Sequence, residues 1–203
     1  MCYELYFIRH GETDWNKQNR FQGHTDIPLN QNGRNQAMLL SSEVRNLGIQ
    51  AVVCSDLARA KETAEIAFSG LDLPMFTTPS LREIKLGVVE GLTKTEVVSK
   101  FGESRYLTYS SIHPSDLDFS FPEGETKLNV VARAKFFLEE FLAKNSYKTI
   151  AVSTHGGVLY WFCHSCDGSP SKPIPITHCT VYKVILDHNN WRYIGPILQV
   201  TER

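Results

Sequence analysis

Several basic residues and one glutamate of this 203-residue chain lie directly after short apolar segments. They are Arg9 and His10 after residues 3–8, Arg59 one helical turn beyond 51–54, Arg82 and Glu83 after 74–78, and His155 after 149–153. A guanidinium offers a planar fork of donors that matches phosphate oxygens, and a neutral imidazole can attack phosphorus through its unprotonated nitrogen. These residue types together indicate phosphoryl chemistry.

The groups beside these histidines would complete such a site. Gly11 and Gly156 follow His10 and His155, and a glycine lets backbone N–H groups approach an anion closely. A carboxylic acid such as Glu83 can protonate a leaving oxygen and later take a proton from water. Because arginines and a second imidazole already supply positive charge, we expect no metal ion.

The elements that must position these residues are apolar strands alternating with helices. Strands are expected over 3–8, 51–54, 74–78 and 149–153, helices over 33–47, 57–68, 125–144 and 158–164, and two final strands over 179–186 and 191–200. This alternation predicts an α/β fold, a three-layer α/β/α sandwich with a mostly parallel central sheet. In such a sheet ligands bind outside the carboxyl ends of the strands, which is where the basic residues lie.

We expect a single domain over residues 1–203, because the length is ordinary for one core and no linker is visible. The segment 102–124 is the least regular part of the chain. It is too long for an ordinary connection, so we expect it to be an active-site cap.

Composition excludes several classes of protein. With 21 Lys and Arg against 22 Asp and Glu, the net charge of -1 argues against nucleic-acid and polybasic membrane binders. Neither a spanning apolar segment nor a signal peptide is visible, and five cysteines are no secreted disulfide framework, so we expect a cytoplasmic protein. Cys163-x-x-Cys166 would suit a redox pair or half a zinc site, but we expect buried, unreactive thiols.

The motifs in which these residues occur resemble those of the histidine phosphatase superfamily, the phosphoglycerate mutase-like family. The matching segments cover most of the chain in the family's order: residues 7–16, 20–29, 55–59, 81–87, 122–126 and 153–156. They most resemble the small bacterial phosphatases of that family.

The resemblance implies a role for each matching position. His10 would be the nucleophile that becomes phosphohistidine, and Glu83 the general acid and then base. Catalysis would also use the clamp around the phosphoryl group, Arg9, Arg59 and His155, with secondary contacts from Asn16 and the backbone at Gly11, Gln22, Gly23 and Gly156. No metal would take part.

Four functions fit this resemblance. We expect a phosphomonoesterase for small phosphorylated metabolites, because the stretch after the Glu83 motif is short and not clearly basic, unlike the insertion of phosphoglycerate mutases. The alternatives are a phosphoglycerate mutase, which alone would need 2,3-bisphosphoglycerate, an alpha-ribazole phosphate phosphatase, and a non-catalytic phosphate-binding module. The protein would be a monomer or a homodimer.

Structural roles compete with the catalytic ones. Glu83 could cap a helix or pair with Arg82, and Glu90 lies in the same region. Arg9 and Arg59 could be ion-pair partners of nearby acids. For His178, just before the last strands, a structural role is favoured over a place in the pocket.

Overall fold

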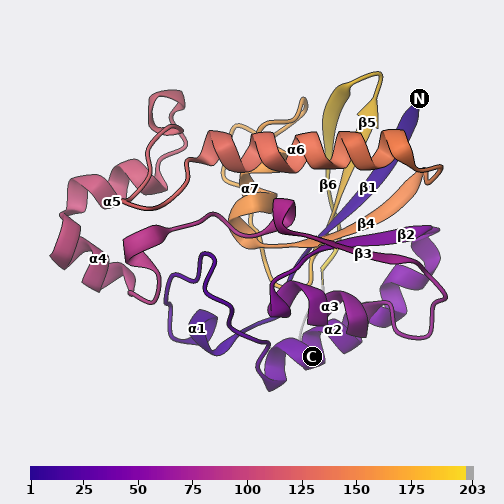
Figure 1. Cartoon of the computed structure of the whole chain (residues 1–203), viewed down its shortest axis with the longest axis horizontal. Helices are drawn as coiled ribbons and strands as arrows, with labels where there is room; N and C mark the ends of the chain where they lie inside the picture. Colours follow the sequence, from indigo (N-terminus) through magenta and orange to yellow (C-terminus); the bar gives the residue numbers. More distant parts are fainter. Residues whose placement is uncertain (200–203) are drawn as a thin grey trace.

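A six-stranded sheet with the order β3-β2-β4-β1-β5-β6 forms the centre of the protein in the computed structural model, which describes residues 1–199 (Figure 1). The strands are β1 (Cys2–Arg9), β2 (Ala51–Ser55), β3 (Met75–Thr78), β4 (Thr149–Thr154), β5 (Val181–Asp187) and β6 (Asn190–Leu198). β3, β2, β4 and β1 are parallel, and the β5–β6 hairpin adds an antiparallel edge beside β1. The mostly parallel α/β sheet is thus confirmed.

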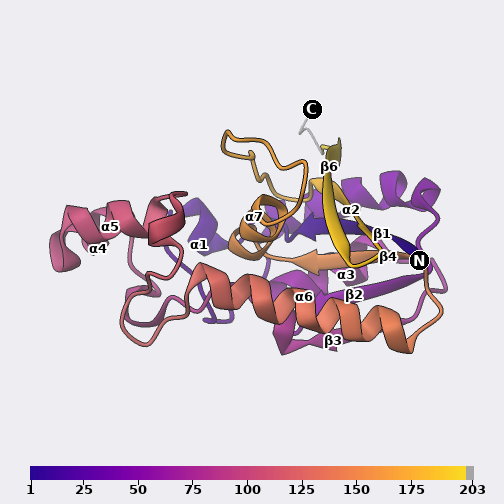
Figure 2. The same cartoon turned by 90° about the horizontal axis from the view of Figure 1, so that it is seen from above.

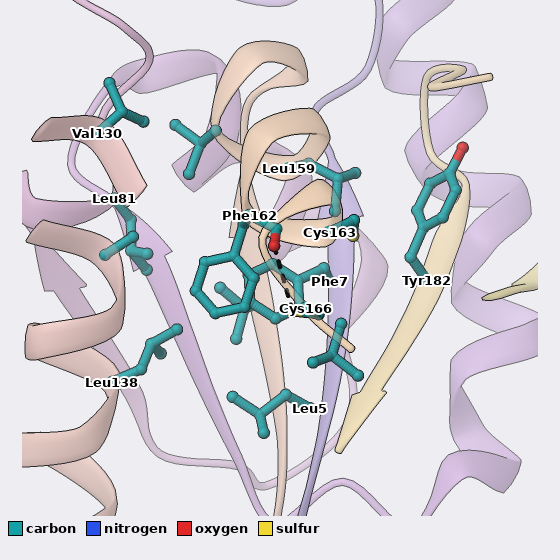
Figure 3. Close-up of a cluster of buried hydrophobic side chains, with 14 of the residues drawn as sticks. Leu5, Phe7, Leu81, Val130, Leu138, Leu159, Phe162, Cys163, Cys166 and Tyr182 are labelled. Atoms are coloured by element: carbon teal, nitrogen blue, oxygen red, sulfur yellow. Dashed lines mark hydrogen bonds between the residues drawn. The ribbon is translucent and has the colours of Figure 1, made fainter. Parts of the chain in front are cut away.

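Helices cover both faces of this sheet (Figures 1 and 2). They are α2 (Gln31–Val44) and α3 (Ala58–Ala67) on one face, and α6 (Lys127–Lys144) and α7 (Gly156–His164) on the other. Successive side chains of a strand point to opposite faces. Tyr6 and Ile8 of β1 therefore pack with α2 and α3, whereas Leu5 and Phe7 pack with α6 and α7. Figure 3 shows Leu5 and Phe7 beside Phe162, whose ring lies 4.7 Å from that of Phe7.

The expected helices are found, with ends set by identifiable caps. Asn30 accepts a hydrogen bond from the N–H of Gly33 at the start of α2, and Thr126 caps α6 in the same way. Helix α2 continues into a 3₁₀ turn over Arg45–Leu47, which ends at Gly48 with a positive φ of 65°. The expected strand 191–200 is β6, and its last residue lies outside the described part of the chain.

The expectation of an irregular segment over 102–124 is wrong in its first half. This segment contains α5 (Glu103–Ser110), which follows α4 (Lys94–Phe101) across Gly102, and both helices extend from one end of the molecule (Figures 1 and 2). Thr93 and Glu96 form a capping box that begins α4. These helices could not be recognised in the sequence, because each has only eight residues and few buried side chains, which leaves no clear apolar pattern. No helix within residues 1–199 is long and apolar enough to cross a membrane.

Candidate active site

The parallel strands bring the four basic and acidic motifs to one edge of the sheet. His10 follows β1, Arg59 lies in the first turn of α3 after β2, Glu83 follows β3, and His155 follows β4 as the N-cap of α7. These four strands are neighbours in the sheet, so their carboxyl ends adjoin. The sequence prediction that these residues converge is reproduced by this topology.

His10 is held in one tautomer. Its side chain is buried, and Nδ1 lies 2.7 Å from the backbone carbonyl oxygen of Gly11. Because a carbonyl oxygen only accepts, Nδ1 must carry the proton, which leaves the lone pair on Nε2. Burial, together with the charges of Arg59 and Arg9, holds the pKa of His10 well below its usual range. The imidazole is therefore neutral and has a free nitrogen that can act as a nucleophile.

Arg59 and His155 form a buried pair close to His10. Arg59 is fully buried and donates to the carbonyl oxygens of Thr25 at 2.9 Å and Gly23 at 2.8 Å. Its Nε donates to Nδ1 of His155 at 3.2 Å, so the proton of this neutral imidazole is on Nε2. Burial and the charge of Arg59 lower the pKa of His155 well below its usual range. The His155 ring lies 5.2 Å from that of His10, close enough to share a bound anion.

Arg9 completes the positive side of the site. Its Nη1 donates to the carbonyl oxygen of Ile176 at 2.7 Å, while its Nε is buried with no hydrogen-bond partner within residues 1–199. Neither Arg9 nor Arg59 forms an ion pair with a neighbouring acid among the described residues, so the structural alternative for these arginines does not hold.

Glu83 is fixed by backbone donors. Its carboxylate accepts from the N–H groups of Gly157 at 3.0 Å, Val158 at 3.2 Å and Ile84 at 2.9 Å. A Cβ at residue 157 would lie 2.5 Å from Glu83 Oε1, so a side chain there would push this carboxylate out of its position. Glu83 therefore does cap the first turn of α7, as the structural alternative held, and this cap also holds it in the wall of the cavity with His10.

Two side chains hold the backbone of Glu83 in place. His24 donates from Nε2 to the Glu83 carbonyl oxygen at 2.9 Å, and Arg133 of α6 donates to the same oxygen at 2.9 Å. Arg133 also donates to the carbonyl oxygen of Arg82 at 2.6 Å and pairs with Glu125 at 2.6 Å. Sequence analysis placed Glu125 in a matching motif, but nothing in the sequence pointed to Arg133.

The site opens into a cavity of about 160 Å³. Its wall contains the expected residues Arg9, His10, Asn16, Gln22, Gly23, Arg59 and Glu83, together with Arg20, Phe21, Ile84, Leu86, Tyr109 and Gly157, which sequence analysis did not assign. Tyr109 belongs to α5, so the expected cap segment contributes to the wall. Most of the residues that were not expected are apolar. In the sequence, such residues look the same as ordinary core residues.

Two expectations for this edge need correction. The N–H of Gly11 donates to Thr63 Oγ1 at 3.0 Å and is not available to an anion. A glycine is required there for packing, because a Cβ would lie 2.4 Å from the carbonyl oxygen of Gly33. Arg82 does not line the pocket. Its guanidinium donates to both carboxylate oxygens of Asp56, from Nε at 2.7 Å and from Nη2 at 2.6 Å.

Other groups near the site have structural roles. Glu90 accepts from the N–H groups of His24, Thr25 and Leu86, which ties two loops together. Asn16 accepts from Thr13 through Oδ1 and so begins the short helix α1 (Asp14–Lys17). No cluster of three or more metal-ligating side chains occurs within residues 1–199.

The two cysteines of the C-x-x-C pair are buried free thiols. Burial raises the pKa of Cys163 well above its usual range and that of Cys166 to about 11. Cys166 donates from Sγ to the carbonyl oxygen of Phe162, as the dashed line in Figure 3 shows. Both thiols are therefore part of the core, as expected.

Comparison with known proteins gives the same assignment as the geometry. The model of the histidine phosphatase superfamily (branch 1) matches residues 5–195. A probable phosphoglycerate mutase GpmB of Escherichia fergusonii is 28% identical, with 97% of this chain and 91% of the relative covered. The solved structure of Bacillus stearothermophilus YhfR is 29% identical with a TM-score of 0.84 and covers 95% of this chain and 96% of its own.

More distant structures share the fold. A mycobacterial glucosyl-3-phosphoglycerate phosphatase solved with VO3 is 23% identical with a TM-score of 0.82, covering 95% of this chain and 98% of its own. A putative alpha-ribazole-5'-P phosphatase of Escherichia coli is 24% identical with a TM-score of 0.80, covering 96% and 95%. The chain therefore belongs to the histidine phosphatase superfamily, branch 1, and is an enzyme of the phosphoglycerate mutase-like type.

Proposed function

We propose that this enzyme is a metal-independent phosphomonoesterase that hydrolyses small phosphorylated metabolites through a phosphohistidine on His10. The observation that carries the proposal is the state of His10: a neutral imidazole with Nδ1 bound to a carbonyl oxygen. Its Nε2 is left free in a cavity whose wall also contains three arginines, Arg9, Arg20 and Arg59, and the carboxyl group of Glu83.

In the first step, the lone pair of His10 Nε2 forms the N–P bond while the bond from phosphorus to the leaving oxygen breaks. Glu83 gives its proton to that oxygen, so the product leaves as an alcohol. Arg9, Arg59 and the Nε2–H of His155 bind the equatorial oxygens, where charge gathers in the transition state.

In the second step, Glu83 takes a proton from water as the water oxygen attacks phosphorus. The N–P bond breaks, orthophosphate leaves and the neutral His10 is restored. Glu83 suits both steps because backbone N–H groups fix its position without an ion pair to another side chain among the described residues.

The cavity wall supports hydrolysis over transfer. A mutase must hold a substrate carboxylate as well as a phosphoryl group, which needs cations beyond the phosphoryl clamp. Only Arg20 offers one in this wall, and it is already bound to the carbonyl oxygen of Gly91 at 2.6 Å and lies near Glu96 at 3.5 Å. The lining also includes Phe21, Leu86 and Tyr109, whose side chains carry no positive charge.

The names of the similar proteins leave the substrate open between several phosphate esters. Relatives at 28–29% identity are named probable phosphoglycerate mutases, so mutase activity is the alternative that most needs a test. Alpha-ribazole phosphate should be tested in the same panel, because one of the structures with a similar fold is named a putative alpha-ribazole-5'-P phosphatase.

Phosphate release from a panel of phosphomonoesters, measured with a chelator present, tests the proposal. We expect hydrolysis by the wild type and loss of activity in His10→Ala. A requirement for added divalent metal would contradict the mechanism. Conversion of 3-phosphoglycerate to 2-phosphoglycerate faster than phosphate release, with stimulation by 2,3-bisphosphoglycerate, would favour the mutase. Phosphate binding without either reaction would indicate a binding module.

A further inference from the structure

A third histidine lies beside the nucleophile. His178 is in the loop between α7 and β5, and its ring lies 6.0 Å from that of His10 at an interplanar angle of 45°. The sequence favoured a structural role for His178 over a place in the pocket. The structure instead places its ring close to the His10 ring.

Among residues 1–199, three buried side-chain nitrogens without a hydrogen-bond partner belong to residues near His10. Five buried side-chain N or O atoms have no hydrogen-bond partner within residues 1–199: Arg9 Nε, Gln22 Oε1, His155 Nε2, His164 Nε2 and His178 Nε2. Most buried polar groups in proteins are paired, so three such nitrogens on residues next to His10 need a common explanation. An anion held on His10 would supply acceptors for all three.

The loop that carries His178 is anchored to Arg9 on both sides. Arg9 donates from Nη1 to the carbonyl oxygen of Ile176 at 2.7 Å, and the N–H of Cys179 donates to the carbonyl oxygen of Arg9 at 2.9 Å. The hydroxyl of Tyr182 donates to the carbonyl oxygen of Pro175 and fixes the start of this turn. The ring of His178 is thus positioned relative to the guanidinium that would clamp the phosphoryl group.

We propose that His178 is a further ligand of the phosphoryl group, donating a hydrogen bond from Nε2–H to a phosphoryl oxygen on His10. This inference rests on the proposed function. Phosphoryl oxygens only accept, so the proton must lie on Nε2. Burial and the charge of Arg9 lower the pKa of His178 to about 3, so the ring adds a directional donor without adding charge.

Two substitutions of similar size separate the donor from the volume it fills. His178→Met removes the donor, whereas His178→Gln keeps an N–H group at the end of a side chain of similar length. We expect His178→Met to weaken the binding of orthovanadate and inorganic phosphate about tenfold and to lower kcat by a similar factor. His178→Gln should recover most of both. His188→Met, in the exposed β5–β6 turn, is the matched control and should change neither.

Equal losses in His178→Met and His178→Gln would overturn the proposal, because packing alone would then explain them. Unchanged orthovanadate binding in His178→Met would do the same. The proposed function can fail separately: if wild-type protein binds orthovanadate through His178 but hydrolyses no phosphomonoester, the ligand is correct and the reaction is wrong. Binding can be measured without catalysis as the rise in melting temperature caused by orthovanadate. This rise should be smaller in His178→Met than in the wild type.

Discussion

Replacing Gly33 with alanine should displace His10, the proposed nucleophile, although Gly33 lies outside the cavity wall. Gly33 lies in the first turn of α2, packed against the two residues that follow His10. A Cβ at this position would lie 2.1 Å from the carbonyl oxygen and 2.7 Å from the nitrogen of Glu12. Both contacts are with backbone, so no side-chain rotation can relieve them.

The magnitude follows from this overlap. Ordinary carbon–oxygen contacts need more than about 3 Å, so α2 and the backbone at Glu12 must separate by about 1 Å. The strand-end loop cannot simply move away, because the N–H of Gly11 is bound to Thr63 of α3. The displacement should therefore disturb the 2.7 Å hydrogen bond between Gly11 and His10 Nδ1. A shift of this size in a catalytic group costs about 100-fold in rate, and overpacking costs about 1–3 kcal/mol of stability.

The assay combines turnover of a phosphomonoester with urea unfolding of the same preparation. We expect kcat of Gly33→Ala to fall by about two orders of magnitude while the protein remains folded at the assay temperature. Asn35→Ala, at an exposed position of the same helix, is the control and should keep wild-type turnover. A Gly33→Ala enzyme with kcat within twofold of wild type would refute the claim that this contact sets the position of His10.

Two further predictions concern pH and the support of Glu83. The pKa values of His10 and His155 are lowered on folding, so below pH ~6.5 the unfolded chain binds more protons than the native protein. Each of these two histidines should therefore lower the free energy of unfolding by about 1.4 kcal/mol for every pH unit below pH ~6.5. A urea midpoint that stays constant as the pH is lowered from 6.5 to 5 would contradict this. Arg133→Met should lower kcat about tenfold and leave orthovanadate binding unchanged, because it removes one of the two donors to the Glu83 carbonyl oxygen and spares the residues proposed to bind the phosphoryl group. Equal losses in kcat and in orthovanadate binding would contradict a positioning role.

The convergence of the motifs could be predicted because it depends only on topology. Once 3–8, 51–54, 74–78 and 149–153 are identified as parallel strands, the residues after them must meet at one edge. The sequence could not show which side chains at that edge face the cavity. Arg82 sits at such a strand end and nevertheless binds Asp56, since side-chain direction depends on neighbours brought from elsewhere in the chain.

His178 and α5 show the other limit of the sequence. The turn before β5 has no periodicity, so the proximity of His178 to His10 depends on anchoring by Arg9 that only the folded loop reveals. Helix α5 places Tyr109 in the cavity wall, yet it has too few buried positions for an apolar pattern. Both contribute to the site through contacts that are distant in the sequence.

The partners of the arginines explain how a chain of net charge -1 can hold a strongly basic pocket. Two guanidinium groups near the pocket are neutralised by carboxylates: Arg82 by Asp56 at 2.6 Å and Arg133 by Glu125 at 2.6 Å. Because the two charges of each pair largely cancel, such pairs add little to the net field at a ligand.

The acceptors that hold Arg9 and Arg59 are neutral instead. Arg9 is held by the carbonyl oxygen of Ile176, and Arg59 by those of Gly23 and Thr25, with His155 as a neutral partner on its Nε. Carbonyl dipoles orient a guanidinium and satisfy its N–H groups without cancelling its charge. The full positive charge of both arginines is therefore left to stabilise a phosphoryl group, and burial strengthens that interaction. Positive charge is concentrated at this site because neutral acceptors hold Arg9 and Arg59. The net charge of the chain does not reveal this concentration.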